Sequence, residues 1–283
     1  MNPREFLDLA KEAARGWSED EASSMGAALA FYALFSMAPL LLLVISILAL
    51  VVDAEVAGRL VFEQLRQLLG EQGAGAVRSV LQAANQRAEG VLAAALSLAM
   101  LVLGATTVFA ELRRDLDRIW RYKKPAGAGW KTVIGPRLWA FGLVLSIGFL
   151  LLVSLVLSAA VSYLGSLWAA VLPGAGLALR ALELGVSFVV VTGLFAMIYK
   201  ILPSVPIAWK DVWVGAAITS LLFAVGKWLI GLYLGRSTVA SPFGAAGTLV
   251  VVILWVYYSA QVFFLGAEFT RAYAVRRAAL QAR

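Results

Sequence analysis

Long apolar stretches without charge alternate along this chain with shorter charged segments. A helix needs about 20 apolar residues to cross the hydrocarbon of a bilayer. The uncharged stretch 138–179 would be about 63 Å long as one helix, so it must break, and Pro173–Gly176 marks a turn. The pattern predicts an all-α polytopic membrane protein with six transmembrane helices. These are expected at 26–52, 90–110, 138–164, 181–202, 212–234 and 245–268.

The segments between the spans have their own patterns. Residues 1–25 predict an amphipathic helix, which either lies along the membrane interface or packs on the bundle. Residues 53–89 predict a helical hairpin outside the membrane, with Gly70–Gly75 between its two helices. The remaining segments are a basic stretch, an external turn and a tail, at 111–137, 165–180 and 269–283.

The distribution of basic residues predicts the orientation of the spans. If the N-terminus lies in the cytoplasm, about 17 Lys and Arg residues fall on that side and about 6 on the other. Segment 111–137 alone carries about eight of them, which opposes its translocation. We therefore expect both termini in the cytoplasm.

Composition narrows the possible functions. The chain is 61% hydrophobic and 14% charged, with a mean hydropathy of +0.85, against about 25% charged residues in soluble domains. It contains no Cys and no His, so disulfides, Cys-ligated metals and histidine bases are excluded. Its net charge of +7 follows from the orientation rule without a nucleic-acid partner. No catalytic or phosphate-binding motif occurs, so we expect neither an enzyme nor a cofactor or metal.

Two ionisable residues in the spans are candidate functional groups, because burying a charge in hydrocarbon is costly. Lys227 lies within 212–234, where it either acts in function or extends its amine to the outer interface. Glu268 lies at the inner end of 245–268. About 20 Å separates their backbones along the membrane normal, so we expect two separate sites.

Polar or aromatic residues also recur on one face of the first and last spans. Such groups contact other helices by hydrogen bonds, or they line a cavity that binds a substrate. Pro39 additionally predicts a kink. The residues are Tyr32, Ser36 and Pro39 in 26–52, and Trp255, Tyr258 and Gln261 in 245–268.

Several short motifs, in order along nearly the whole chain, resemble the YihY/virulence factor BrkB family. They occur at 27–39, 200–203, 226–228, 243–247, 255–258 and 265–268. The motif residues are Lys200, Pro203, Gly226, Trp228, Gly244, Gly247 and Gly266. Asp117 stands where the resemblance leads us to expect Asn. An older ribonuclease BN label attached to such proteins has no support in a chain without His or a metal cluster.

The resemblance implies a bacterial inner-membrane protein with six spans, associated with export or flipping of lipid-like molecules. Together with the polar span faces, it favours a transporter or flippase-like exporter of an amphiphilic envelope molecule, with membrane lipids as partners. The alternative is a non-transporting scaffold whose partners dock on 111–137 and 53–89.

Overall fold

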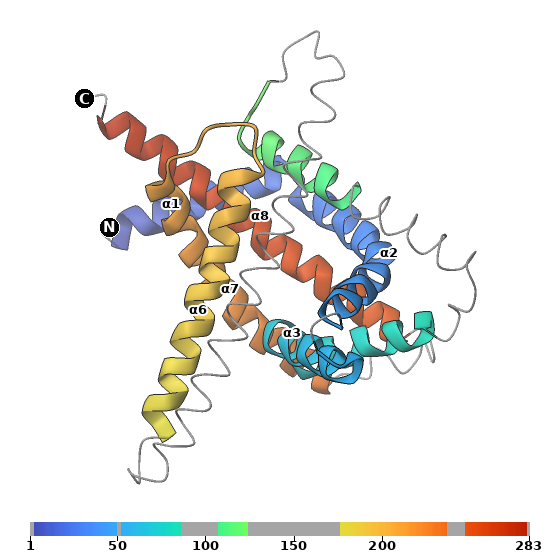
Figure 1. Cartoon of the computed structure of the whole chain (residues 1–283). Helices are drawn as coiled ribbons and strands as arrows, with labels where there is room; N and C mark the ends of the chain where they lie inside the picture. The colour runs from blue at the N-terminus through green and yellow to red at the C-terminus, as the bar shows by residue number, and fades with distance from the viewer. Residues whose placement is uncertain (1–2, 50–51, 86–106, 124–175, 237–246, 282–283) are drawn as a thin grey trace.

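The computed structural model describes residues 3–49, 52–85, 107–123, 176–236 and 247–281. All regular elements in these ranges are α-helices, as the sequence predicted. Predicted span 138–164 and most of 90–110 lie outside the described residues. The helices are α1 (Pro3–Glu19), α2 (Ala22–Leu48), α3 (Ala54–Asn85), α6 (Gly176–Ile201), α7 (Trp209–Arg236) and α8 (Gly247–Gln281), with a further helix at 107–119 (Figure 1).

Three of the described helices, α6, α7 and α8, are long and apolar enough to cross a membrane. Their apolar windows, Leu184–Ile201, Trp209–Ile230 and Val250–Gln281, coincide with the last three predicted spans. Large apolar side chains on α6 and α7 are exposed, as expected where lipid is the solvent. They include Leu184, Phe188 and Val189 on α6, and Leu221, Leu222, Val225, Trp228, Leu229 and Leu232 on α7.

Two helices extend beyond the predicted spans. Helix α6 begins at Gly176, so the last residues of the predicted turn 165–180 are helical. Helix α8 continues to Gln281, so most of the predicted tail 269–283 continues the helix of the last predicted span. The extension is stabilised by packing: Phe269 and Ala272 are buried against Leu9 and Ala13 of α1.

The N-terminal segment also ends earlier than predicted. Helix α1 stops at Glu19, Glu21 has a left-handed backbone (φ 55°), and α2 begins at Ala22. Residues 22–25, predicted to belong to the amphipathic helix, are therefore the start of α2. The apolar face of α1 packs on α8, with the rings of Phe6 and Phe269 5.7 Å apart. This is the bundle-packing alternative for the amphipathic helix.

Segment 53–89 is not a pair of helices in this structure. Helix α3 runs unbroken from Ala54 to Asn85, across the glycines that were expected to separate a hairpin. Ala76 and Val77, just beyond those glycines, are buried against Val252 of α8 and residues of α2. Contact with neighbouring helices thus outweighs the weak helix propensity of glycine.

Helix α8 is the central element of the described bundle. It contacts α1, α2, α3 and α7, and in Figure 1 it crosses the whole molecule. The main core joins Phe263 and Phe264 of α8 to Tyr199 of α6 and to Leu116 and Ile119 of the 107–119 helix.

Glycines allow polar side chains to pass between α8 and its neighbours. A β-carbon at Gly215 of α7 would overlap with Oγ1 of Thr270, and one at Gly266 of α8 would overlap with Oγ1 of Thr219. Behind Gly266, the Tyr199 hydroxyl donates to the carbonyl of Phe263 at 2.7 Å. Such close approach is how small residues hold membrane helices together.

Both ends of the described chain lie at the same end of the bundle. The C-terminal half of α8 packs on α1, residues 118–121 contact the α1–α2 junction, and residue 117 contacts the α6–α7 turn. The N- and C-terminal helices lie side by side in Figure 1. Helix α3 instead packs near the start of α8.

Replacement of Gly215 or Gly266 by Ala is expected to lower the free energy of unfolding by about 1–3 kcal/mol, since the added carbon meets a stiff threonine on another helix. Gly185→Ala in α6 is the matched control, because a β-carbon there meets nothing within 4 Å. Thermal unfolding in detergent micelles measures the difference. Equal midpoints for all three variants would contradict this packing.

Candidate functional site

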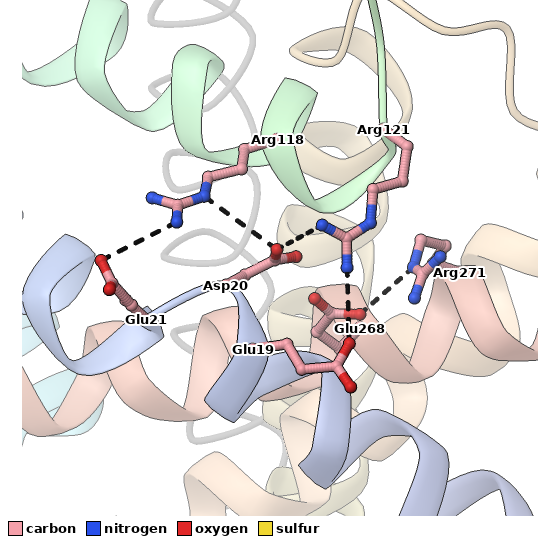
Figure 2. A network of polar contacts seen from close by, with 7 residues as sticks. All are labelled: Glu19, Asp20, Glu21, Arg118, Arg121, Glu268 and Arg271. Atoms are coloured by element: carbon pink, nitrogen blue, oxygen red, sulfur yellow. Dashed lines mark hydrogen bonds and ion pairs between the residues drawn. The ribbon is translucent and has the colours of Figure 1, made fainter.

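The most polar buried site in the described chain surrounds two carboxyl groups, Asp20 and Glu268, each with 1% of its surface exposed. Asp20 occupies the break between α1 and α2. Glu268 projects from α8 onto Gly16 of α1, where a β-carbon would overlap with the carboxylate. The two carboxyl groups lie next to each other in Figure 2 and interact electrostatically.

Arginines from two segments approach the outer oxygens of this pair (Figure 2). Arg121 donates to Asp20 Oδ1 at 2.5 Å, and Arg118 Nε lies 4.0 Å from the same oxygen. Arg271, one helical turn after Glu268, donates to Glu268 Oε2 at 3.2 Å. The site therefore joins α1, α8 and the end of the 107–119 helix by charge.

Two exposed carboxylates complete the cluster. Glu19 Oε2 lies 3.8 Å from Arg121, and Glu21 Oε2 lies 3.8 Å from Arg118. The remaining oxygens of the buried pair, Asp20 Oδ2 and Glu268 Oε1, have no hydrogen-bond donor among the described residues. Buried polar atoms without a partner are rare and costly, so these two need a physical explanation.

An open polar cleft adjoins the pair. It has a volume of about 510 Å³ and is lined by residues of α1 and by Arg271. Gly16, on which Glu268 rests, and Glu19, which contacts Arg121, both lie in its wall. The cleft brings solvent to the edge of the buried carboxyl groups.

A second polar contact connects the 107–119 helix to the α6–α7 turn. Asp117 accepts hydrogen bonds from the backbone and hydroxyl of Ser204 at 2.6 and 2.7 Å, and Arg113 donates to the same hydroxyl at 3.0 Å. Asp117, the residue that departs from the expected Asn, thus has a structural role in this chain. Pro203, a motif residue, is buried beside Ser204.

Lys200, another motif residue, closes the same turn. Its amine donates to the carbonyl of Ile207 and lies 5.7 Å from the centre of the Trp209 ring. The cation–π geometry and the hydrogen bond both hold the end of α6 against the start of α7. These contacts give the motif residue Lys200 a structural role in the turn.

Asp115 is a third buried carboxyl group, on the same helix as Asp117. It is 6% exposed, and its Oδ2 has no donor among the described residues. Burial, with a smaller effect of nearby Glu111, raises the pKa of Asp115 to about 7.

The aromatic and polar residues predicted on one face of the last span contact two different helices. Trp255 packs edge-on against Phe223 of α7, with 5.6 Å between the ring centres. Tyr258 projects onto Gly226 of α7. Gln261 instead donates to the backbone carbonyl of Ala22 at 3.3 Å and rests on Gly26, both in α2. These side chains make helix contacts, which is the first of the two predicted roles.

The first-span candidates are only partly described. Tyr32 is half-buried in α2, with its ring 5.8 Å from that of Phe31. Ser36 and Pro39 lie within the continuous helix α2, and their side chains are outside the described set.

Lys227 is half-buried in α7, directly after Gly226. Because Gly226 meets Tyr258, Lys227 lies about 15 Å along α8 from Glu268. Glu268 contacts Asp20 and Arg271, so the structure places these two candidates in separate surroundings.

The other motif positions have different surroundings. Trp228 is 66% exposed on the outer face of α7. Gly226 and Gly266 permit close helix approach. Gly247 is the first residue of α8, and Gly244 lies outside the described residues.

Sequence reasoning found Glu268 but missed the residues around it. Asp20, Arg118 and Arg121 belong to segments that were interpreted only through their overall charge. One available signal was Glu19–Glu21, an acidic run between an amphipathic helix and an uncharged span. Its partners are about a hundred and about 250 positions away, so no local pattern connects them.

These features define an α-helical membrane protein whose terminal helices and basic segment meet in an ionic cluster. A family model described as virulence factor BrkB matches residues 13–283, so the chain belongs to that family. The resemblance stated from the motifs is confirmed.

This chain is similar to part of the length of several curated relatives. A UPF0761 membrane protein of Alcanivorax borkumensis is 25% identical over 92% of this chain and 59% of its own, and one of Pseudomonas paraeruginosa is 24% identical over 92% and 61%. A third, from Tolumonas auensis, is 31% identical over 62% of this chain and 56% of its own. The chain thus spans about three fifths or less of these relatives. No solved structure matches.

Asp115→Asn is expected to flatten the pH dependence of stability. The folded chain retains a proton on Asp115 that the unfolded chain releases above about pH 4, so the free energy of unfolding falls as the pH rises from about 4 to about 7. Asparagine has the same shape and cannot ionise, so the free energy of unfolding of this variant should lack this part of the decrease with pH. Chemical unfolding in detergent at a series of pH values tests it, with exposed Asp8→Asn as control. An identical slope in the wild type and in Asp115→Asn would contradict the assignment.

Proposed function

We propose that this protein is a bacterial inner-membrane protein with six spans and both termini in the cytoplasm. At one end of the bundle, a single core joins the start of α2, the 107–119 helix, the end of α6, the start of α7 and the middle of α8. That end carries Arg113, Arg118, Arg121, Lys200 and Arg271. The orientation rule favours the cytoplasm for it.

Because the chain has no cysteine, single cysteines can report this topology directly. Gln82→Cys, exposed on α3, should react with a membrane-impermeant maleimide in spheroplasts. Gln281→Cys, exposed at the end of α8, should react only after the membrane is permeabilised. Reaction of both positions in sealed spheroplasts would contradict a cytoplasmic C-terminus.

Within this topology, we infer a transporter or flippase-like exporter of a lipid-like, anionic amphiphile, acting without catalysis. The observation that supports it is Lys227, an ionisable group half-buried within the apolar helix α7. A cation at that depth is costly unless it faces a partner or a polar path, and it offers a binding group for a phosphate or carboxylate headgroup. Tyr258 lies at the same level on α8 and supplies a hydroxyl nearby.

One observation favours the alternative of a scaffold. Trp255, Tyr258 and Gln261, predicted to line a cavity, are taken up by contacts with α7 and α2. A bundle closed by such contacts suits a protein that holds partners rather than one that moves a substrate. A transport assay in reconstituted vesicles separates the two functions.

The assay uses proteoliposomes containing an anionic or a zwitterionic fluorescent phospholipid, with loss of signal to an external quencher as the readout. Wild type should move the anionic lipid faster than protein-free vesicles do, and Lys227→Ala should reduce the rate about tenfold, the effect of losing a charged hydrogen bond. Lys210→Ala is the matched control, since Lys210 is exposed at the start of α7. If wild type moves neither lipid faster than empty vesicles do, the scaffold is favoured.

A further inference from the structure

We propose that Asp20 and Glu268 form a proton-binding site, in which one shared proton joins α1 to α8 at the end of the bundle. Nothing in the transport proposal is needed for this inference. The ligand is a proton, and the consequence is that docking of the N-terminal helix depends on pH.

The hydrogen-bond chemistry of the pair requires a donor between the two carboxyl groups. Asp20 Oδ1 and Glu268 Oε2 are occupied by arginines, whereas Asp20 Oδ2 and Glu268 Oε1 are buried without a donor among the described residues. An ionised carboxylate only accepts hydrogen bonds, so two ionised neighbours cannot satisfy each other. A single proton turns one group into a donor and gives both their missing partner.

The charge of the cluster also favours one bound proton. The residues drawn in Figure 2 include four carboxyl groups and three guanidinium groups, and one bound proton makes the sum neutral. Two buried carboxylates in contact repel each other, and such pairs in proteins commonly retain one proton. The three arginines oppose a metal cation as the ligand, because they would repel it.

The open cleft beside α1 includes Gly16, Glu19 and Arg271 in its wall, so water reaches the edge of the pair. The charged groups that face the pair or line this cleft come from α1, its junction with α2, the 107–123 segment and α8. They are Asp8, Lys11, Glu12, Arg15, Glu19, Glu21, Arg118, Arg121 and Arg271.

Loss of the proton has a definite structural consequence. It places two negative charges together in a site that excludes water, directly above Gly16 of α1. The repulsion acts between α1–α2 and α8, so the contact of Leu9 and Ala13 with Phe269 and Ala272 is weakened. High pH therefore loosens the N-terminal helix.

The test is infrared spectroscopy of the full chain in lipid nanodiscs, in an Asp115→Asn background that removes the buried acid of the 107–119 helix. Asp211, the fourth buried acid among the described residues, is paired with Arg277 at 2.6 Å. At neutral pH we expect the carbonyl band of a protonated carboxylic acid, and we expect it to diminish as the pH rises to about 9. Glu268→Gln and Asp20→Asn should each remove the band. Glu12→Gln, an exposed residue of the cleft, should retain it. Absence of the band at neutral pH, or its persistence in both pair variants, would overturn the proposal.

Stability gives an independent readout. The folded chain binds a proton that the unfolded chain releases above about pH 5, so the free energy of unfolding should fall with rising pH in the Asp115→Asn background. The amide of Glu268→Gln donates to Asp20 as the protonated acid does, so this variant should keep its stability at high pH. Glu268→Ala, which cannot donate, should be less stable than Glu268→Gln at every pH. If Glu268→Gln does not fold, Asp20→Asn serves in its place. An equal dependence of the free energy of unfolding on pH in Asp20→Asn and in the Asp115→Asn background would refute the shared proton.

Discussion

A polar side chain is tolerated inside this apolar bundle only where the neighbouring helix leaves room for it and supplies a partner. Helix α8 meets this requirement repeatedly: Tyr258 and Thr270 enter gaps at glycines of α7, and Gln261 enters one in α2. Without water, an unmet hydrogen-bonding group is expensive, so each of these contacts also fixes the distance between two helices. The arrangement of the whole bundle around α8 depends on this constraint.

The same constraint becomes more severe for charge. Glu268 occupies a gap at Gly16, but its partners come from three separate segments, the α1–α2 junction, the end of the 107–119 helix and the next turn of α8. Breaking one contact leaves a buried charge exposed to an apolar environment, which costs more than the contact itself contributes. The cluster therefore adds a polar connection between elements that apolar packing also joins.

The contacts at this end of the bundle also give the family motifs a physical explanation. Lys200 and Pro203 shape the α6–α7 turn, which Asp117 and Arg113 hold through Ser204. Gly226 and Gly266 permit helix approach. Most of the described motif residues thus contribute to the contacts between helices.

Membrane helices α6, α7 and α8 followed directly from the sequence, because crossing hydrocarbon imposes a length and an absence of charge that local composition reveals. The site did not. The sequence identified Glu268 only as a lone acid at the end of a span. It did not show that Glu268 lies beside Asp20 and on Gly16, or that Asp20 forms ion pairs with Arg118 and Arg121. These contacts join segments about a hundred to 250 positions apart. The unbroken α3 likewise required its contacts with α2 and α8, which outweigh the propensity of its glycines. Solvation is a property of each segment and can be read locally, whereas the partner of a buried polar group is decided only when the helices have packed.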